Sequence, residues 1–178
     1  QKFSYVYETE PENLNYITSG KAATHDITGN LIDGLFENDK YGNLIPSLAK
    51  DWTVSQDGLT YTYKLRDDAK WYDSEGEEYA DVTAKDFVTG IKYAADNKSE
   101  MLYIIQDSIK GLNDYVSGKN KDFSAVGVKA VDDHTLQITL NQPESYWNSK
   151  LTLGITFPVN EKFVKSKGDK FAQASDTS

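Results

Sequence analysis

Residues 52–66 carry the feature that most constrains the fold, because two short segments of alternating large and polar side chains flank a Ser-Gln-Asp-Gly turn. In the second segment the large side chains, at every other position, are Leu59, Tyr61, Tyr63 and Leu65. A period of two is typical of a strand with one buried face. Asp57 and Gly58 are residues that favour a tight hairpin turn. The sequence therefore predicts an antiparallel hairpin whose aromatic face lies in the core.

The aromatic side chains of this region also allow a second interpretation, a stacking platform for a sugar, a peptide or a base. Its members would be Trp52, Tyr61, Tyr63, Trp71 and Tyr72. The strict alternation and the helix predicted directly after the hairpin favour the structural interpretation. We therefore expect Trp71 to be a large buried ring that stabilises the hairpin.

The best helix signal lies between residues 81 and 98. Thr83 can cap its start, and Asp86 stands at the capping-box position three residues later. Phe87 and Ile91 begin an apolar stripe at helical spacing. A second helix is predicted over residues 100–115, since one side of it would carry Leu102, Ile105, Ile109 and Leu112.

Three further elements are predicted. Alternation of Phe3, Tyr5 and Tyr7 indicates a first strand. Apolar residues at spacings of three and four indicate a helix that Gly34 ends; they are Ile27, Leu31, Ile32 and Leu35. Residues 126–140 predict a second hairpin with an Asp-Asp-His turn, and one face of it carries Leu136, Ile138 and Leu140. Hairpins mixed with helices give an α+β fold class.

Composition limits the partners of the chain. Its 178 residues are 38% hydrophobic, which suffices for a globular domain with a core. The net charge is −9, and no cluster of Lys and Arg is dense enough to follow a phosphate backbone or an anionic membrane. Cysteine is absent, so disulfides and thiol chemistry are excluded. We expect no nucleic-acid partner.

No catalytic or metal-binding constellation stands out. The acidic runs, Glu75 to Glu78 and Asp132 to Asp133, fall in predicted turns where carboxylates are ordinarily solvated. The two histidines, His25 and His134, are far apart in the sequence and lack metal-ligand spacing. The expectation is a non-catalytic protein without a cofactor or metal.

Four sequence blocks in one order resemble a known family. They are Pro-Ser-Leu-Ala-x-x-Trp at 46–52, Ser-x-Asp-Gly-x-Thr-Tyr-x-Tyr-x-Leu-Arg at 55–66, Lys-Trp-Tyr-Asp at 70–73 and Val-Thr-Ala-Lys-Asp-Phe-Val at 82–88. This order is similar to the signature of extracellular solute-binding proteins of the peptide and nickel ABC-importer class. Residues 127–143 are most similar to its oligopeptide-binding members, in particular the lipoproteins of Gram-positive bacteria. The loop after Trp71 departs from the family pattern, since the stretch from Ser74 to Asp81 is longer.

The resemblance implies the N-terminal portion of a periplasmic-binding-protein-like type II fold. By the family layout, residues 1–35 begin the first ligand-binding domain, 36–159 form the extra domain with antiparallel hairpins packed on helices, and 160–178 start the return to the first domain. Members usually run to about three times this length, so the chain is expected to be an N-terminal fragment without the second lobe.

The resemblance also implies a site and partners. The ligand contacts of this part of the family come from the loop that here holds Thr18, Ser19, Gly20 and Lys21, and a flexible turn is the competing interpretation of that loop. The implied partners are oligopeptides and the permease of an ABC importer, and the implied location is the outer cell surface, through a lipid anchor outside this chain. An acidic and aromatic module that binds another protein, or a scaffold, remains the alternative function.

Overall fold

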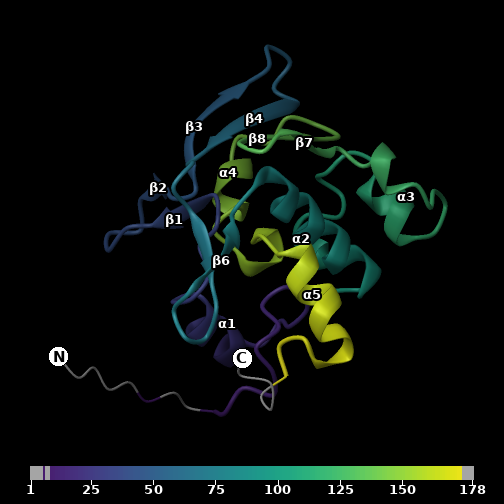
Figure 1. Cartoon of the computed structure of the whole chain (residues 1–178). Helices are drawn as coiled ribbons and strands as arrows, with labels where there is room; N and C mark the ends of the chain where they lie inside the picture. The colour runs from purple at the N-terminus through teal and green to yellow at the C-terminus, as the bar shows by residue number, and fades with distance from the viewer. Residues whose placement is uncertain (1–5, 7–8, 174–178) are drawn as a thin grey trace.

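A four-stranded antiparallel sheet with the order β3-β4-β8-β7 organises the computed structural model, which describes residue 6 and residues 9–173. The strands are β3 (Ala49–Val54), β4 (Thr60–Leu65), β7 (Val128–Asp132) and β8 (Thr135–Thr139). Two smaller sheets pair β1 (Phe36–Asn38) with β2 (Leu44–Pro46), and β5 (Lys70–Tyr72) with β6 (Glu78–Asp81). Figure 1 shows the large sheet as one layer, with the helices gathered beneath it.

The helices are mostly short. The α-helices are α1 (Ala22–Thr28), α2 (Ala84–Asp96), α3 (Leu112–Val116), α4 (Trp147–Lys150) and α5 (Glu161–Lys167). The 3-10 helices are η1 (Leu102–Ile104), η2 (Phe123–Ala125), η3 (Gly154–Thr156) and η4 (Gly168–Lys170). Among the helices of the described residues only α2 is long, and it contacts β7 and β8 from below the sheet.

Both predicted hairpins are confirmed. Tyr61, Tyr63 and Leu65 are buried on β4, and Leu136 and Ile138 are buried on β8. The sheet brings the two hairpins together, because β4 pairs with β8 and sets Tyr63 opposite Leu136. The aromatic face of the first hairpin therefore packs in the core, as a strand with one buried face requires.

The capped helix is also confirmed. Thr83 is the N-cap of α2, and its backbone N–H donates to Asp86 Oδ2 at 3.0 Å. Phe87 and Ile91 are buried on the side that faces the sheet. The capping signal and the apolar stripe together located this helix within a few residues.

The prediction of one helix over residues 100–115 is wrong. The four apolar side chains named for it are buried, but they lie on η1, a turn, a bridge at Ile109 and the start of α3. Lys110 donates its backbone N–H to Thr139 O at 2.9 Å, and Gly111 adopts φ +74°. Because this stretch pairs with the end of β8, it does not form one helix. The spacing of apolar residues along the sequence does not reveal such a distant contact.

The helix predicted through Leu35 is too long. Helix α1 ends at Thr28, residues 29–31 form a turn in which Leu31 is 69% exposed, and β1 begins at Phe36. At Gly34 a Cβ atom would come within 2.8 Å of Leu151 O. Backbone packing at Gly34 therefore overrides the apolar spacing. The strand predicted from Phe3 to Tyr7 lies outside the described residues.

Trp71 is not the buried ring that the sequence suggests. It is half-buried at the edge of the core, and Trp52 is 37% exposed. The fully buried tryptophan is Trp147. Its helix, α4, lies beneath the sheet in Figure 1. The hairpin strand instead buries Tyr61 and Tyr63, whose rings stack with centroids 6.2 Å apart.

Candidate functional site

The loop of Thr18 to Lys21 lies at the start of α1 and is held by hydrogen bonds to two other segments of the chain. Thr18 is half-buried and Ser19 is buried, whereas Gly20 and Lys21 are exposed. Asn15 folds the loop, since its Oδ1 accepts the Thr18 N–H at 3.1 Å and its carbonyl oxygen accepts the Ser19 N–H at 3.0 Å. The structure thus brings all four predicted site residues together on one short ordered turn.

A second segment, distant in sequence, clamps the same loop. Glu100 donates its backbone N–H to Thr18 O at 3.0 Å, and its Oε2 accepts the Gly20 N–H at 2.7 Å. The neighbouring Ser99 Oγ donates to Ile17 O at 2.6 Å. Residue 20 also has little room for a side chain, because a Cβ there would lie 3.0 Å from Glu100 Oε2. Sequence reasoning missed Glu100, and no local motif signals a contact across 80 residues.

The backbone donors of the loop are all occupied within the protein. The N–H groups of Thr18, Ser19 and Gly20 bond as described, and the Lys21 N–H donates to Ser19 Oγ at 3.1 Å. His25 Nε2 lies 2.7 Å from Ser19 O, which occupies that carbonyl as well. Among the described residues no partner bonds to the Gly20 carbonyl, and the Lys21 ammonium has no ion pair. These two groups, together with the half-buried Thr18 side chain, are what the loop offers to a ligand.

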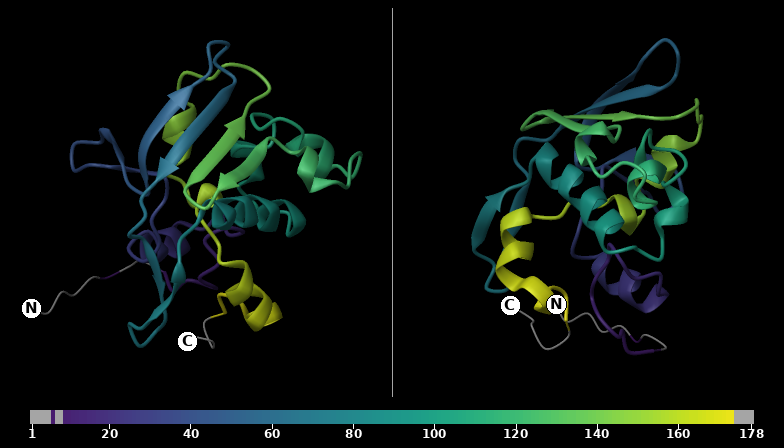
Figure 2. Two further views of the ribbon diagram at one scale, coloured as in Figure 1. Left: turned by 45° about the horizontal axis from the view of Figure 1, so that its top comes forward. Right: turned by 90° about the vertical axis from the view of Figure 1, so that its right-hand side faces the viewer.

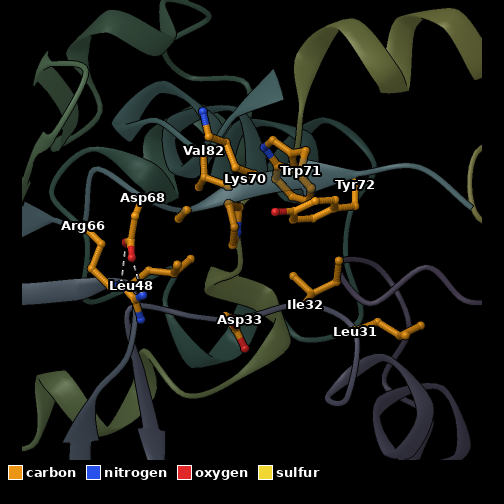
Figure 3. A pocket seen from close by; sticks show the side chains of 12 residues that line it. Leu31, Ile32, Asp33, Leu48, Arg66, Asp68, Lys70, Trp71, Tyr72 and Val82 are labelled. Atoms are coloured by element: carbon orange, nitrogen blue, oxygen red, sulfur yellow. Dashed lines mark hydrogen bonds and ion pairs between the residues drawn. The ribbon is translucent and has the colours of Figure 1, made fainter. Parts of the chain in front are cut away.

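A polar cavity of about 230 Å³ opens between the β5 hairpin and residues 31–33. Figure 3 shows the Arg66–Asp68 ion pair on one side of it and the rings of Trp71 and Tyr72 on the other. Arg66 holds Asp68 through two bonds of 2.9 and 2.8 Å, and this contact lowers the pKa of Asp68. Lys70 pairs with Asp81. The charged groups at the rim are thus mostly paired with one another.

An apolar cavity of about 170 Å³ lies beyond Trp71. Its lining includes the rings of Tyr16, Trp71, Tyr79, Phe163 and Phe171. Burial raises the pKa of Tyr16, whose hydroxyl donates to Pro158 O at 2.8 Å. Neither cavity is lined by the loop of Thr18 to Lys21. The aromatic platform exists only in part, since Trp71 and Tyr72 border cavities while Tyr61 and Tyr63 are buried.

Over residues 9–173 no group of three or more His, Asp or Glu side chains is arranged to hold a metal ion. Within the same part of the chain, none of the helices has both the length and the apolar character to cross a bilayer.

Comparison with known proteins defines the family. Residues 43–177 match the family described as bacterial extracellular solute-binding proteins, family 5 Middle. This match covers well over half of the chain. The chain belongs to family 5 of the bacterial extracellular solute-binding proteins.

Individual family members are similar over nearly all of the chain. The oligopeptide-binding protein SarA of Streptococcus gordonii is 74% identical over 176 residues, which are 99% of this chain and 26% of that protein. AliA of Streptococcus pneumoniae, also an oligopeptide-binding protein, is 66% identical, over 99% of this chain and 27% of its own length. The chain thus spans about a quarter of the relatives that it matches.

A solved structure confirms the fold class. Listeria monocytogenes OppA bound to peptide superposes with a TM-score of 0.84 at 36% identity, over 94% of this chain and 32% of that one. Mixed helices and antiparallel sheets of this type are therefore a fold that oligopeptide-binding proteins of the family contain. The predicted resemblance is confirmed by family, by relatives and by structure.

Proposed function

We propose that this chain is part of an extracellular oligopeptide-binding protein that captures peptides for an ABC importer and carries out no chemistry on them. The observation that carries the proposal is 74% identity to an oligopeptide-binding protein over 99% of the chain. Attachment to the cell surface by a lipid anchor outside this chain and delivery to a permease belong to the same proposal.

The loop of Thr18 to Lys21 is the proposed peptide contact of this segment. Its four N–H groups are occupied, so a peptide would meet the Gly20 carbonyl, the Lys21 ammonium and the Thr18 side chain instead. A carbonyl accepts a peptide N–H or amino group, and an ammonium pairs with a carboxylate. Such contacts act on the main chain and termini of a peptide, which allows broad sequence specificity.

The division of the chain into residues 1–35, 36–159 and 160–178 also belongs to the proposal. In this layout the first part and the last part contribute to the ligand-binding domain, and the middle part is the extra domain beside it. The clamp between the loop and Ser99-Glu100 would then be a contact between the two domains. A rigid join of this kind suits a receptor in which one lobe closes onto the other.

Titration calorimetry with one peptide pool tests the proposal on the 178-residue chain and on the full-length protein that contains it. We expect the chain to bind at least about 100-fold more weakly, a loss of about 2.7 kcal/mol, because a peptide between two lobes takes its affinity from both walls. Equal affinity would contradict the two-lobe account.

Variants of the full-length protein test the loop. Lys21→Ala should weaken peptide binding by about tenfold if its ammonium meets a carboxylate that becomes desolvated. Lys50→Ala, an exposed lysine on β3, is the matched control and should leave affinity unchanged. If the two variants bind alike, the proposed contact at Lys21 is wrong.

A further inference from the structure

Strand β7 forms one edge of the four-stranded sheet, and its outer side faces a groove. The strand order β3-β4-β8-β7 leaves β7 with a single neighbour among the described strands. Figure 1 places β7 at the end of the sheet nearest α3, and the left view of Figure 2 shows α2 running beside it. An edge strand carries a row of backbone groups that can pair with another extended chain.

The pairing register shows which backbone groups point outward. Thr139 N–H donates to Gly127 O at 2.7 Å, and the register continues with Lys129 opposite Gln137. Antiparallel pairing alternates, so Lys129 directs its N–H and C=O toward β8, whereas Val128 and Ala130 direct theirs away. Val128 N–H bonds back to Val126 O. Within the part of the chain that the structure describes, the Val128 C=O and both backbone groups of Ala130 remain open for a partner strand.

The groove along this edge has a volume of about 580 Å³. Its apolar lining includes Val88 of α2, Phe123 of η2 and Val126, and its polar lining includes Gln137 and Thr139 of β8. Residues of α2, η2, β7 and β8 therefore line one hollow along this edge, with room for an extended peptide segment beside β7.

The groove is also lined by three lysines of an acidic chain, Lys85, Lys110 and Lys129. Lys85 is paired with Glu161 at 2.8 Å. Over residues 9–173, Lys110 and Lys129 have no ion-pair partner. Two unpaired ammonium groups beside an apolar surface complement a partner that carries carboxylates and apolar side chains.

From these observations we propose that the β7 edge is a docking site for an extended acidic segment of another protein, which adds a strand to the sheet. Directly opposed side chains share a face of the sheet. The partner residue opposite Lys129 therefore lies on the outer face, where Lys129 favours Asp or Glu. Its neighbours, opposite Val128 and Ala130, face the side of Val88 and should be apolar. The recognised pattern is an alternation of acidic and apolar residues.

The pattern distinguishes this site from the proposed transport site. Binding through main-chain pairing at an edge needs neither a free amino terminus nor a free carboxylate. A probe with both ends blocked lacks the terminal groups that the loop of Thr18 to Lys21 could bind, and variants on the β7 edge separate the two sites further. We choose a short fluorescent peptide of alternating Val and Glu with acetylated and amidated ends.

Fluorescence anisotropy with the 178-residue chain measures the affinity. The double variant Lys110→Glu, Lys129→Glu should weaken binding at least about tenfold, since two attractive charge pairs become repulsive. Ala130→Pro should weaken it as well, because it removes an outward N–H at an edge position where proline is tolerated. Lys50→Glu, on the opposite edge strand β3, is the matched control and should bind as the parent chain does. Circular dichroism verifies the fold of each variant.

Three results would overturn the proposal. Absence of binding to the blocked peptide would mean that Lys129 and the bulge after Ala130 serve only to protect the edge. Undiminished binding of a peptide N-methylated at alternate residues would exclude strand addition. Dimerisation of the free chain that the double lysine variant abolishes would assign the edge to a second copy of this chain.

Discussion

The indole Nε1 of Trp71 donates to Asp86 Oδ2 at 2.9 Å and joins the β5 hairpin to the first turn of α2. The same carboxylate oxygen accepts the N–H of the N-cap Thr83. Asp86 is buried, and that burial raises its pKa even though both hydrogen bonds act in the opposite direction. The Asp86 carboxylate thus links the β5 hairpin to α2, although removing its charge from water costs free energy.

Trp71→Phe should lower the free energy of unfolding by about 1.5–3 kcal/mol, because it removes a hydrogen bond to a buried charged group. Chemical denaturation at pH 7 measures the loss. In the background of Asp86→Asn the same substitution should cost less, and this double-mutant cycle isolates the contact. Equal costs in the two backgrounds would show that the ring stabilises the hairpin by packing alone.

The pH dependence of this contact has a definite sign. A carboxyl whose pKa is raised in the folded state binds more protons there than in the unfolded state, so its contribution to stability falls as pH rises from the unfolded pKa through the folded pKa. Trp71→Phe removes a bond that lowers this pKa and should move the decline to higher pH. Unfolding measured from pH 3 to 8 follows it, and an unchanged profile would contradict the assignment to Asp86.

The three tryptophans should rank by burial when each is replaced by alanine. Trp147→Ala should cost about 3–5 kcal/mol, since it empties a fully buried site. Trp71→Ala should cost less, and Trp52→Ala, whose ring is 37% exposed, least. Urea denaturation of the three variants gives the order. A larger loss of unfolding free energy for Trp52→Ala than for Trp147→Ala would show that Trp147 does not lie in the core.

Gly90 of α2 should resist replacement by alanine. A Cβ at this position would lie 2.4 Å from Phe157 O, so α2 and the residue that follows η3 would have to separate. We expect Gly90→Ala to lower the unfolding free energy by about 1–3 kcal/mol through overpacking. This loss would occur although alanine has the higher helix propensity. Thr89→Ala in the same helix is the control, and a gain of stability for Gly90→Ala would refute the close approach.

Glu161 should make the protein sensitive to acid. Hydrogen bonds from Lys165 and Lys85 lower the pKa of Glu161 from its ordinary 4.5 to about 2. A lowered pKa gives stability that is present above the unfolded value and is lost as pH falls from about 4.5 toward 2. Glu161→Gln should therefore flatten the acid side of the stability profile. Because these groups are partly exposed, the effect should weaken in high salt.

Carboxyl NMR resolves the titration of Glu161 itself. Lys85→Met should raise its pKa by removing the link from α2, and Lys165→Met should raise it by removing the link within α5. Lys162→Met, next to Glu161 in the same helix but not paired with it, is the control. A pKa that stays near 2 in both paired variants would contradict the assigned causes.

Local rules located much of the fold from the sequence. Alternation identified β4 and β8, and the Thr83–Asp86 spacing identified the start of α2, because these signals depend on neighbours along the chain. The failures depend on distant contacts. Lys110 bonds to Thr139 and therefore does not continue a helix. Gly34 packs against Leu151 instead of lying in the predicted helix.

The candidate site, like the fold, was only partly predictable from the sequence. The family resemblance pointed to Thr18 through Lys21, and these residues form one ordered turn. The clamp by Glu100 was not predictable, because its bond to Gly20 joins residues 80 positions apart. The burial of Trp147 was not predictable from the sequence for a related reason. It follows a proline-containing turn without periodicity, and only the assembled sheet shows the space that its ring fills.

The central pairing of β4 with β8 has a consequence for how the chain acquires its structure. Thr60 pairs with Thr139, so the middle of the sheet closes a loop of nearly 80 residues. Contacts of such long sequence separation slow folding, since the entropy of closure is lost before the pairing energy is gained. The first hairpin can form early from local contacts. During synthesis, the face of this hairpin that carries Tyr61 and Tyr63 stays exposed to water until the ribosome has released β8, which pairs with β4, and residues 144–148, which accept hydrogen bonds from both tyrosine hydroxyls.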